Sequence, residues 1–300
     1  MDKETAKRRE LANRVAGAFK ESLNACASVV VGSTARARTD RYSDIDMTIF
    51  FTELPDQKAA ADIQAGLGVT DWRKLGEGDD RAFMDTFFIE GIDCQVGFCT
   101  IDYLEETIDD VLLRNDTDHD KHTIMGGLME ALPLYGDEIV EGWKARLAHY
   151  PTELARAMVT AHLDFRPIWI LRERFAGRDT LIVFQTVAGD IARKLLGVYL
   201  GLNRLYPEHD FKRLSGLTDR MSIAPQEFDR RLRTLVSGRY DEALHEMQTL
   251  IEETFALVEK HMPELDTSAA RAKFSRPDPT TAAPDPTVAN EANSLEQQAH

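Results

Sequence analysis

Two aspartates separated by one residue form the chemical centre of this sequence. Asp44 and Asp46 flank Ile45 where an alternating run begins, and side chains two residues apart on a strand project from the same face. Two carboxylates a few ångströms apart repel by about 4 kcal/mol at an effective dielectric of 20, so such a pair is held by cations or hydrogen bonds, or one member is protonated. Oxygen ligands on a rigid strand suit Mg²⁺, which commonly takes one or two carboxylates and substrate phosphates. The pair therefore predicts a magnesium site.

A turn suited to a phosphate precedes the aspartates. The β-branched run 28–31 ends at Gly32-Ser33, a pattern that predicts a buried strand followed by a sharp turn. Gly32 lets the backbone approach a ligand closely, and Ser33 offers a hydroxyl and a backbone N–H. If residues 34–38 begin a helix, its free N–H groups and dipole favour a phosphate. A strand, such a turn and a nearby carboxylate pair are what a metal-dependent nucleotide site requires.

A third acid and an arginine extend the candidate site. Asp93 lies in the run 91–98, which is otherwise apolar or small at its centre, and an acid there is costly unless it faces a site. It either completes a metal cluster or acts as the general base for an acceptor hydroxyl; the alternative is a plain hairpin-edge residue. Arg36 suits a triphosphate, and it equally suits an exposed short helix.

These residues carry a resemblance to a known family. Gly32-Ser33, followed after ten residues by Asp44-Ile45-Asp46 and later by a strand aspartate, resemble the DNA polymerase β-type nucleotidyltransferase superfamily. Within it, the chain is similar to small bacterial enzymes with a helical C-terminal domain, namely the aminoglycoside and lincosamide nucleotidyltransferases and their uncharacterised relatives. The segment 201–207 resembles the uncharacterised group more loosely.

The resemblance implies a role for each matching position. Gly32 and Ser33 would hold a nucleoside triphosphate, with ATP as the expected donor, and Asp44 and Asp46 would bind one or two Mg²⁺. The third acid is a metal ligand in some members and the base in drug-modifying ones, so the role of Asp93 stays divided. The implied reaction is in-line attack of an acceptor hydroxyl on the α-phosphate with release of pyrophosphate, and positioning and metal electrostatics carry most of such catalysis.

The hydrophobic pattern predicts an α+β domain over residues 1–148 that contains the site. After an opening amphipathic helix, we expect a nucleotidyltransferase-type mixed sheet with flanking helices, in which two strands form a hairpin at 90–91. The interval 66–80 is expected to be a polar loop. The expected strands are 28–31, 44–51, 83–89, 92–98 and 132–135, and the expected helices are 55–65, 102–113 and 122–131.

The second half of the sequence predicts an all-α bundle over 149–265. Apolar residues recur at helical spacing through 152–175, 180–204 and 226–262. From residue 266 to 300 the composition changes to prolines among small polar residues, and such a segment cannot bury enough surface to offset its ordering entropy. We therefore expect a disordered tail there.

Composition limits the class of protein and its partners. The chain has 300 residues, with 43% hydrophobic and 29% charged residues and a formal net charge of -15, which is the balance of a globular protein. No apolar run is long enough to span a membrane, and a charged N-terminus disfavours a signal peptide. Cys26, Cys94 and Cys99 show no metal or disulfide spacing, so we expect a reducing cytoplasm. The acidic balance disfavours a broad nucleic-acid surface.

The expected activity is that of a magnesium-dependent nucleotidyltransferase. It would move a nucleoside monophosphate, AMP in the case of ATP, to a hydroxyl of a small molecule such as an aminoglycoside-like acceptor. Alternatives are an adenylyltransferase that modifies a protein partner, of the toxin-neutralising type, one that modifies tRNA, and an inactive nucleotide-binding module. The oligomeric state stays open.

Two further polar groups have structural explanations. The cluster 118–122 lacks the spaced partners of a metallohydrolase site, so we interpret it as the polar start of a helix. Asp190 has Arg193 and Lys194 at helical spacing, and an ion pair within the helix is the more common outcome than a phosphate site.

Overall fold

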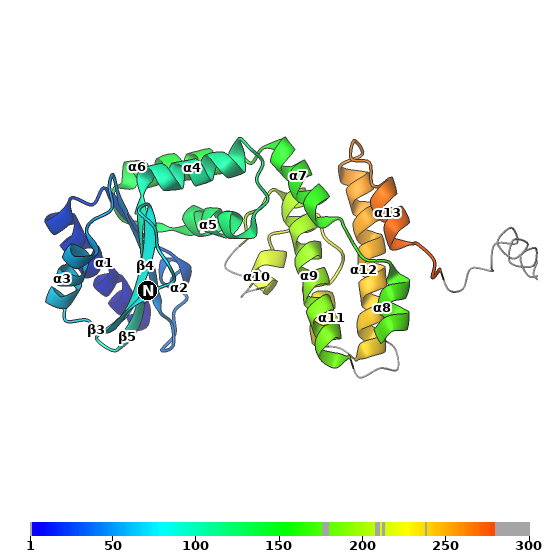
Figure 1. Ribbon diagram of the computed structural model, residues 1–300, viewed down its shortest axis with the longest axis horizontal. Coiled ribbons are helices and arrows are strands. Elements are labelled where there is room, and N and C mark those ends of the chain that lie inside the picture. The colour runs from blue at the N-terminus through cyan, green and yellow to red at the C-terminus, as the bar shows by residue number, and fades with distance from the viewer. Residues whose placement is uncertain (1, 176–179, 208–210, 212–213, 238, 280–300) are drawn as a thin grey trace, which may run out of the picture. The chain divides into compact units, whose positions relative to one another are not determined.

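The computed structural model describes residues 2–175, 180–207, 211, 214–237 and 239–279. The chain divides into two compact units (Figure 1). The first comprises Met1–Ala157 and Arg204–Arg220, and the second comprises Met158–Asn203 and Met221–His300.

The first unit is built on a mixed sheet, as the sequence predicts. Within the described residues the sheet has six strands in the order β3-β4-β5-β2-β1-β6. Strands β2 and β5 are parallel, and the other neighbouring pairs are antiparallel. The strands are β1 (Ala27–Val30), β2 (Ile45–Phe51), β3 (Thr70–Leu75), β4 (Ala82–Ile89), β5 (Ile92–Thr100) and β6 (Leu132–Tyr135).

One face of the sheet packs against α1 (Lys3–Leu23) and α3 (Gln57–Gly66), and the hydrophobic core lies between them. The carboxylate of Asp2 caps the start of α1 by accepting from the Thr5 N–H, and Asn24 ends the helix in the left-handed conformation. The buried stripe of α1 consists of Leu11, Val15 and Phe19 with intervening alanines. Burial of this stripe fixes which face of the sheet points inward.

The opposite face carries the half-buried polar positions of the strands. Helices α4 (Ile101–Leu112), α5 (His119–Glu130) and α6 (Asp137–Leu147) follow β5 and flank this face. In α6 the ring of Trp143 lies edge-on to Phe50 of β2, with 4.9 Å between centroids. The candidate site lies on this side of the sheet.

One segment from the second half of the sequence belongs to the first unit. The sequence assigns 204–220 to the helical domain, whereas the described residues of this segment, with α10 (Leu214–Thr218), group with the first unit. Pro207 lies so close to α5 that a Cβ atom on Gly126 would be 1.9 Å from its carbonyl oxygen. The ring of Tyr206 lies 5.0 Å from that of Tyr150, so buried aromatic contacts hold the segment in place.

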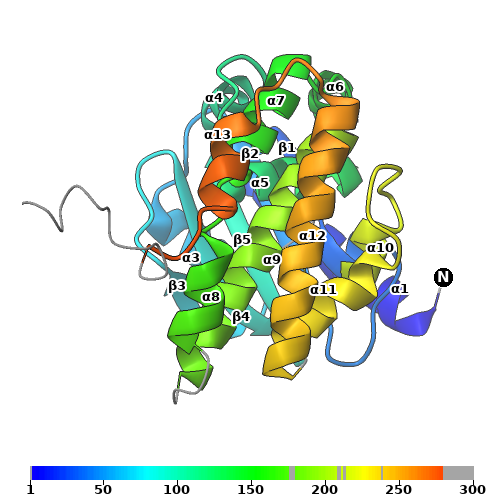
Figure 2. The ribbon, with the colours of Figure 1, turned by 90° about the vertical axis from the view of Figure 1, so that its right-hand side faces the viewer.

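The second unit is helical, as expected (Figure 2). Helix α12 packs against α8, α9 and α11. The hydroxyl groups of Tyr199 in α9 and Thr254 in α12 share a hydrogen bond of 2.8 Å in the buried interior. The helices are α7 (Thr152–His162), which starts in the first unit, α8 (Ile168–Phe175), α9 (Leu181–Asn203), α11 (Phe228–Ser237), α12 (Tyr240–His261) and α13 (Ser268–Phe274).

Three expectations differ from the structure. The interval 66–80 contains the edge strand β3, whose residues are all exposed. The helical run 152–175 is interrupted after His162, where Pro167 disfavours a helical conformation of the residue before it. The run 226–262 is likewise two helices, α11 and α12.

Part of the segment that is expected to be disordered from residue 266 is helical. Helix α13 occupies part of that range, and its Phe274 is buried with its ring 6.1 Å from that of Phe255. Arg271 forms a 2.9 Å ion pair with Glu259 of α12. The buried ring of Phe274, this ion pair and the ion pair between Lys273 and Asp164 hold the segment, which composition alone does not reveal. Residues 280–300 lie outside the described residues.

No helix among the described residues has the length and hydropathy of a membrane span. Cys26, Cys94 and Cys99 are free cysteines.

Candidate functional site: a carboxylate pair beside a glycine turn

Strand β2 presents Asp46 on the face opposite the hydrophobic core. Along β2, Ile45 and Met47 are buried against the core, whereas Asp46 and Thr48 are half-buried on the other face. Strand β2 begins at Ile45, one residue later than the sequence predicts, so Asp44 immediately precedes the strand. Asp46 therefore occupies a strand position on the face that the alternation predicts, whereas Asp44 lies just before the strand.

The register of β5 brings the third acid to the same end of the sheet. Ile45 lies opposite Cys94 and Asp46 lies opposite Gln95. Continuing the parallel register by one residue places Asp44 beside Asp93. Burial raises the pKa of the Cys94 thiol, and the negative charges of the three aspartates, the first of them Asp46, raise that pKa further. The three aspartates are thus near enough to Cys94 for their charges to act on its thiol.

Among the described residues, the carboxylate of Asp93 accepts one side-chain hydrogen bond. The hydroxyl of Thr86 on β4 donates to Oδ1 of Asp93 over 3.0 Å, and both residues are on the face that Asp46 shares, as the antiparallel register of β4 and β5 requires. This contact orients the carboxylate but leaves Oδ2 for another partner. It is compatible with a metal ligand and with a general base.

Gln95 is a site residue that the sequence analysis did not identify. It lies opposite Asp46 in the parallel pair and lines the cavity described below. A glutamine amide supplies N–H donors that suit phosphate or hydroxyl oxygens. The position of Gln95 opposite Asp46 follows from the register between β2 and β5, which the sequence does not specify.

The turn after β1 lies against the carboxylate of Asp46. Gly32 has φ +64°, and a Cβ atom there would lie 2.7 Å from Oδ2 of Asp46. The Val31 N–H donates to the Asp46 carbonyl oxygen over 2.9 Å, which fixes the turn to β2. A side chain at this position would be strained by the backbone and would collide with the carboxylate.

The helix expected after the turn is a single turn. Helix α2 spans Gly32–Ala35, which is too short to present a helix dipole to a phosphate. Phosphate binding by this segment therefore depends on the backbone and hydroxyl groups of the turn itself. The hydroxyl of Ser33 has no hydrogen-bond partner among the described residues.

Thr34 joins the turn to the aspartate pair. Its side chain is fully buried, and Oγ1 donates to the Asp44 carbonyl oxygen over 3.3 Å. From α1, Arg9 Nε donates to the Thr34 carbonyl over 3.1 Å. Arg8 Nε donates to the Ser43 carbonyl over 2.8 Å. Two arginines of α1 thus hold both ends of the loop that connects the turn to Asp44.

The sequence contained one signal for this arrangement. Arg8 is buried, and it lies three residues before Leu11 on the apolar stripe of the first helix. A charged residue on such a stripe is costly unless its donors are satisfied. In this protein the acceptors include the backbone of the site loop.

Arg36 lies beside the site, and its guanidinium is already bound. Its Nη1 lies 2.6 Å from Oε2 of Glu130 at the end of α5. The other carboxylate oxygen of Glu130 lies 3.4 Å from Nη1 of Arg220. A triphosphate would have to compete with Glu130 for Arg36, so the expected role of this arginine depends on a rearrangement of that pair.

A cavity of about 520 Å³ opens between this face of the sheet and the helices α4 and α5. Gly32, Arg36 and Asp46 line it at one end. Asp44 and Asp93 are outside its lining among the described residues. The cavity therefore adjoins the aspartates and extends away from them along the strands, past Thr48 and Gly97.

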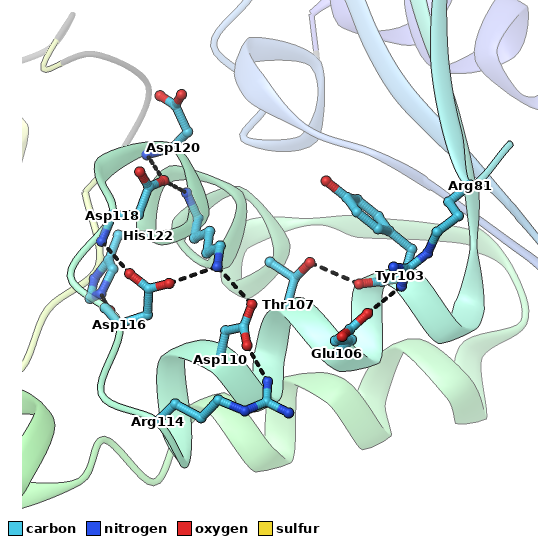
Figure 3. Close-up of polar contacts among 11 residues, drawn as sticks. Arg81, Tyr103, Glu106, Thr107, Asp110, Arg114, Asp116, Asp118, Asp120 and His122 are labelled. Atoms are coloured by element: carbon cyan, nitrogen blue, oxygen red, sulfur yellow. Dashed lines mark hydrogen bonds and ion pairs between the residues drawn. The ribbon is translucent and has the colours of Figure 1, made fainter. Parts of the chain in front are cut away.

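Lys121 joins the two helices that wall this cavity (Figure 3). Its Nζ lies 2.6 Å from Oδ2 of Asp110 in α4 and 2.6 Å from Oδ2 of Asp116 in the connecting loop. These contacts raise the pKa of Lys121, the hydrogen bond to Asp110 contributing most, and they lower the pKa of both carboxyls.

Asp118 caps α5 by accepting from the N–H groups of residues 120 and 121, which confirms the interpretation of the cluster 118–122 as the polar start of a helix.

Asp190 behaves as the simpler explanation predicts. Its carboxylate accepts from Arg193 Nη2 over 3.2 Å within α9. The pair belongs to the second unit and is an ordinary exposed ion pair.

The donor set fits a magnesium ion bound together with phosphates. No three acidic, histidine or cysteine side chains among the described residues already converge on a metal position. Asp44 and Asp46 provide carboxylate oxygens, and Gly32 leaves open the space beside Oδ2 of Asp46 that a Cβ would fill. Mg²⁺ usually binds through one or two carboxylates and completes its shell with water and substrate phosphates.

Comparison with known proteins gives only remote likenesses. No protein-family model matches the sequence, and no curated protein is significantly similar to it. A solved cytoplasmic RNA terminal U-transferase matches at 15% identity and a TM-score of 0.28, over 43% of this chain and 40% of the other. This chain thus corresponds to well under two thirds of that structure's length.

Two further solved structures match over more of the chain. A nucleotidyltransferase-like protein from Exiguobacterium sibiricum has 12% identity and a TM-score of 0.36, over 86% of this chain and 80% of the other. The Cid1 poly(U) polymerase has 16% identity and a TM-score of 0.30, over 67% and 49%. At these values the likenesses carry no assignment of function, which depends on the residues of the site.

Proposed function

We propose that this protein is a nucleotidyltransferase that moves a nucleoside monophosphate from a nucleoside triphosphate to a hydroxyl of a small acceptor. The observation that carries the proposal is the glycine turn of Gly32 lying against Oδ2 of Asp46, with Asp44 and Asp93 at the same end of the sheet. A glycine turn beside carboxylates, next to a cavity, is what a metal-bound triphosphate needs.

Each residue has a role in this proposal. The backbone of Gly32 and the hydroxyl of Ser33 hold the triphosphate, and Asp44 and Asp46 hold Mg²⁺. When bound, the metal neutralises phosphate charge and stabilises the charge that develops during transfer. Gln95 lies opposite Asp46 in the strand pair and supplies amide donors to the same region. Free thiols at all three cysteines are compatible with a reducing cytoplasm.

The chemical step balances as a substitution at phosphorus. The acceptor oxygen forms a bond to the α-phosphorus, and the bond between that phosphorus and the oxygen bridging to the β-phosphate breaks. Pyrophosphate leaves with the electron pair. The hydroxyl proton goes to Asp93 if this carboxylate is the general base, and to solvent if Asp93 is a metal ligand.

Product analysis with labelled nucleotides tests the reaction type. The full-length protein is incubated with Mg²⁺, a panel of hydroxylated acceptors that includes an oligonucleotide, and each nucleoside triphosphate labelled at the α- or the γ-phosphate. We expect the γ-label in pyrophosphate and the α-label in the acceptor, and we expect Asp46→Asn to abolish both.

Three results would contradict the proposal. They are release of the γ-label as a single phosphate, transfer of the γ-label to the acceptor, and unchanged turnover by Asp46→Asn. Asp62→Asn is the matched control, because Asp62 is an exposed residue of α3, which packs on the other face of the sheet. This variant should retain wild-type turnover.

A further inference from the structure

The wall of the cavity beside Asp46 is mainly aromatic and aliphatic. The sheet contributes Phe50 and Met84, and the helices contribute Leu104 and Ile124. The volume of about 520 Å³ lies within the range of roughly 300 to 1,000 Å³ of small-molecule sites. Such a wall gains free energy by removing apolar ligand surface from water.

The charges in the lining argue against a polyionic occupant. Among the described residues, the charged side chains that line the cavity are Arg36, Asp46 and Glu77. Arg36 is paired with Glu130, and Asp46 is assigned to the metal. A nucleic acid needs clustered cations for its phosphates, and a polycationic sugar needs several carboxylates. Neither set is present in this lining.

The rim of the cavity is also apolar. Leu75, Met84 and Ile124 line it with exposed fractions of 40%, 42% and 42%. They come from β3, β4 and α5, so three separate elements present large apolar side chains at one opening. Methionine adapts to ligands of different shape because its side chain is flexible and polarisable. This opening therefore suits an apolar ligand that enters from solvent.

We propose that this cavity binds the uncharged, apolar body of the acceptor, aromatic or alicyclic, and directs its hydroxyl toward Asp46. That the ligand is the acceptor rests on the proposed function. That the ligand is apolar and uncharged rests on the cavity alone. It replaces the aminoglycoside-like acceptor that the family resemblance implied. The negative charge of the whole chain says little about this lining, because charge elsewhere on the surface is screened by salt over about 10 Å.

A cavity-filling variant tests the inference without nucleotide. Gly127 lines the cavity from within α5, and no described atom lies within 4 Å of a Cβ built there. Gly127→Leu therefore places a side chain in the cavity without a backbone collision. Gly142→Leu is the matched control, because Gly142 is also inside a helix, also has open space at its Cβ, and is outside the lining.

The probe is N-phenyl-1-naphthylamine, a neutral aromatic dye that fluoresces in apolar surroundings. We expect saturable binding to the full-length wild type and to Gly142→Leu, and at least tenfold weaker binding to Gly127→Leu. Met84→Glu provides a second variant, at a position that is 42% exposed, and it should also weaken binding. A naphthalene alcohol should displace the dye, whereas kanamycin and an oligouridylate should not.

Equal dye affinity in the wild type, Gly127→Leu and Met84→Glu would overturn the inference, as would displacement by kanamycin or the oligouridylate alone. Because the dye experiment contains no nucleotide, its failure leaves the proposed function standing. Conversely, if the protein binds the dye but binds no nucleotide, the transferase proposal is wrong and the apolar ligand site stands.

Discussion

A Cβ atom on Gly32 would lie 2.7 Å from Oδ2 of Asp46. The backbone of Gly32 is in the left-handed region, with φ +64°, so a side chain at this position would meet backbone strain and would also displace the end of the Asp46 side chain. The turn after β1 and the carboxylate on β2 are therefore fitted to each other. This fit joins the phosphate-binding half of the proposed site to its metal-binding half.

Gly32→Ala should affect both the stability of the protein, through backbone strain in the turn, and the binding of nucleotide. We expect a loss of about 1 kcal/mol in the free energy of unfolding from the left-handed backbone. We also expect loss of Mg²⁺-nucleotide binding, because the methyl group displaces the Asp46 carboxylate. Thermal unfolding with and without Mg²⁺-nucleotide measures both effects.

Gly68→Ala is the control for this variant. Gly68 has φ +73°, and no described atom lies within 4 Å of a Cβ there. It should lose similar stability and retain full nucleotide binding. If Gly32→Ala binds nucleotide as well as Gly68→Ala does, the turn has no role in holding the ligand.

Lys121→Met should destabilise the protein in a pH-dependent manner. Lys121 joins Asp110 and Asp116 through two ion pairs of 2.6 Å, and partly exposed pairs contribute about 1 kcal/mol or less each. The folded-state pKa of each carboxyl is lowered, so their contribution is present above the ordinary aspartate pKa and is lost as pH falls through the lowered value. The raised pKa of Lys121 keeps it charged to above its ordinary pKa of 10.5.

The difference in melting temperature between the wild type and Lys121→Met should therefore have its largest value from about pH 5 to pH 10. It should amount to about 2 to 4 °C and shrink toward pH 3. Lys58→Met serves as the control, because Lys58 is exposed in α3 and its removal should cost little at any pH. A constant difference from pH 7 to pH 3 would show that the lysine contributes through packing instead.

Two truncations test where the ordered chain ends. Removing residues 267–300 deletes α13 with its buried Phe274, and loss of a buried phenylalanine costs about 3 kcal/mol. Removing 280–300 keeps α13 and should leave the melting temperature unchanged. Phe274→Ala in the full chain should reproduce most of the larger loss; if both truncations melt like the full chain, α13 contributes no stability.

Local patterns in the sequence predict most of the elements around the site. The β-branched run before Gly32, the alternation after Asp44 and the hairpin at 90–91 all correspond to strands. Local patterns do not predict strand β3, because its residues are all exposed and apolar residues do not alternate with polar ones along it. Its strand conformation comes from pairing with β4.

The site itself depends on pairings between distant segments. Gln95 faces Asp46 only because β2 and β5 are parallel in this register. The bond from Arg36 to Glu130 joins residues 94 apart in the sequence. Such relationships follow from tertiary packing. Residue type and spacing alone predict the glycine turn, and the role that they assign to the acids stays a prediction.

The most direct test of the central claim is thermal unfolding of the wild type, Asp46→Asn and Asp62→Asn with each of the four nucleoside triphosphates, with and without Mg²⁺. A ligand at about 100 times its dissociation constant stabilises the folded state by about 2.7 kcal/mol. We predict a Mg²⁺-dependent stabilisation by at least one nucleotide in the wild type and Asp62→Asn, and its loss in Asp46→Asn. A stabilisation of the same size in Asp46→Asn, or none with any nucleotide in the wild type, would contradict a metal–nucleotide site at Gly32 and Asp46.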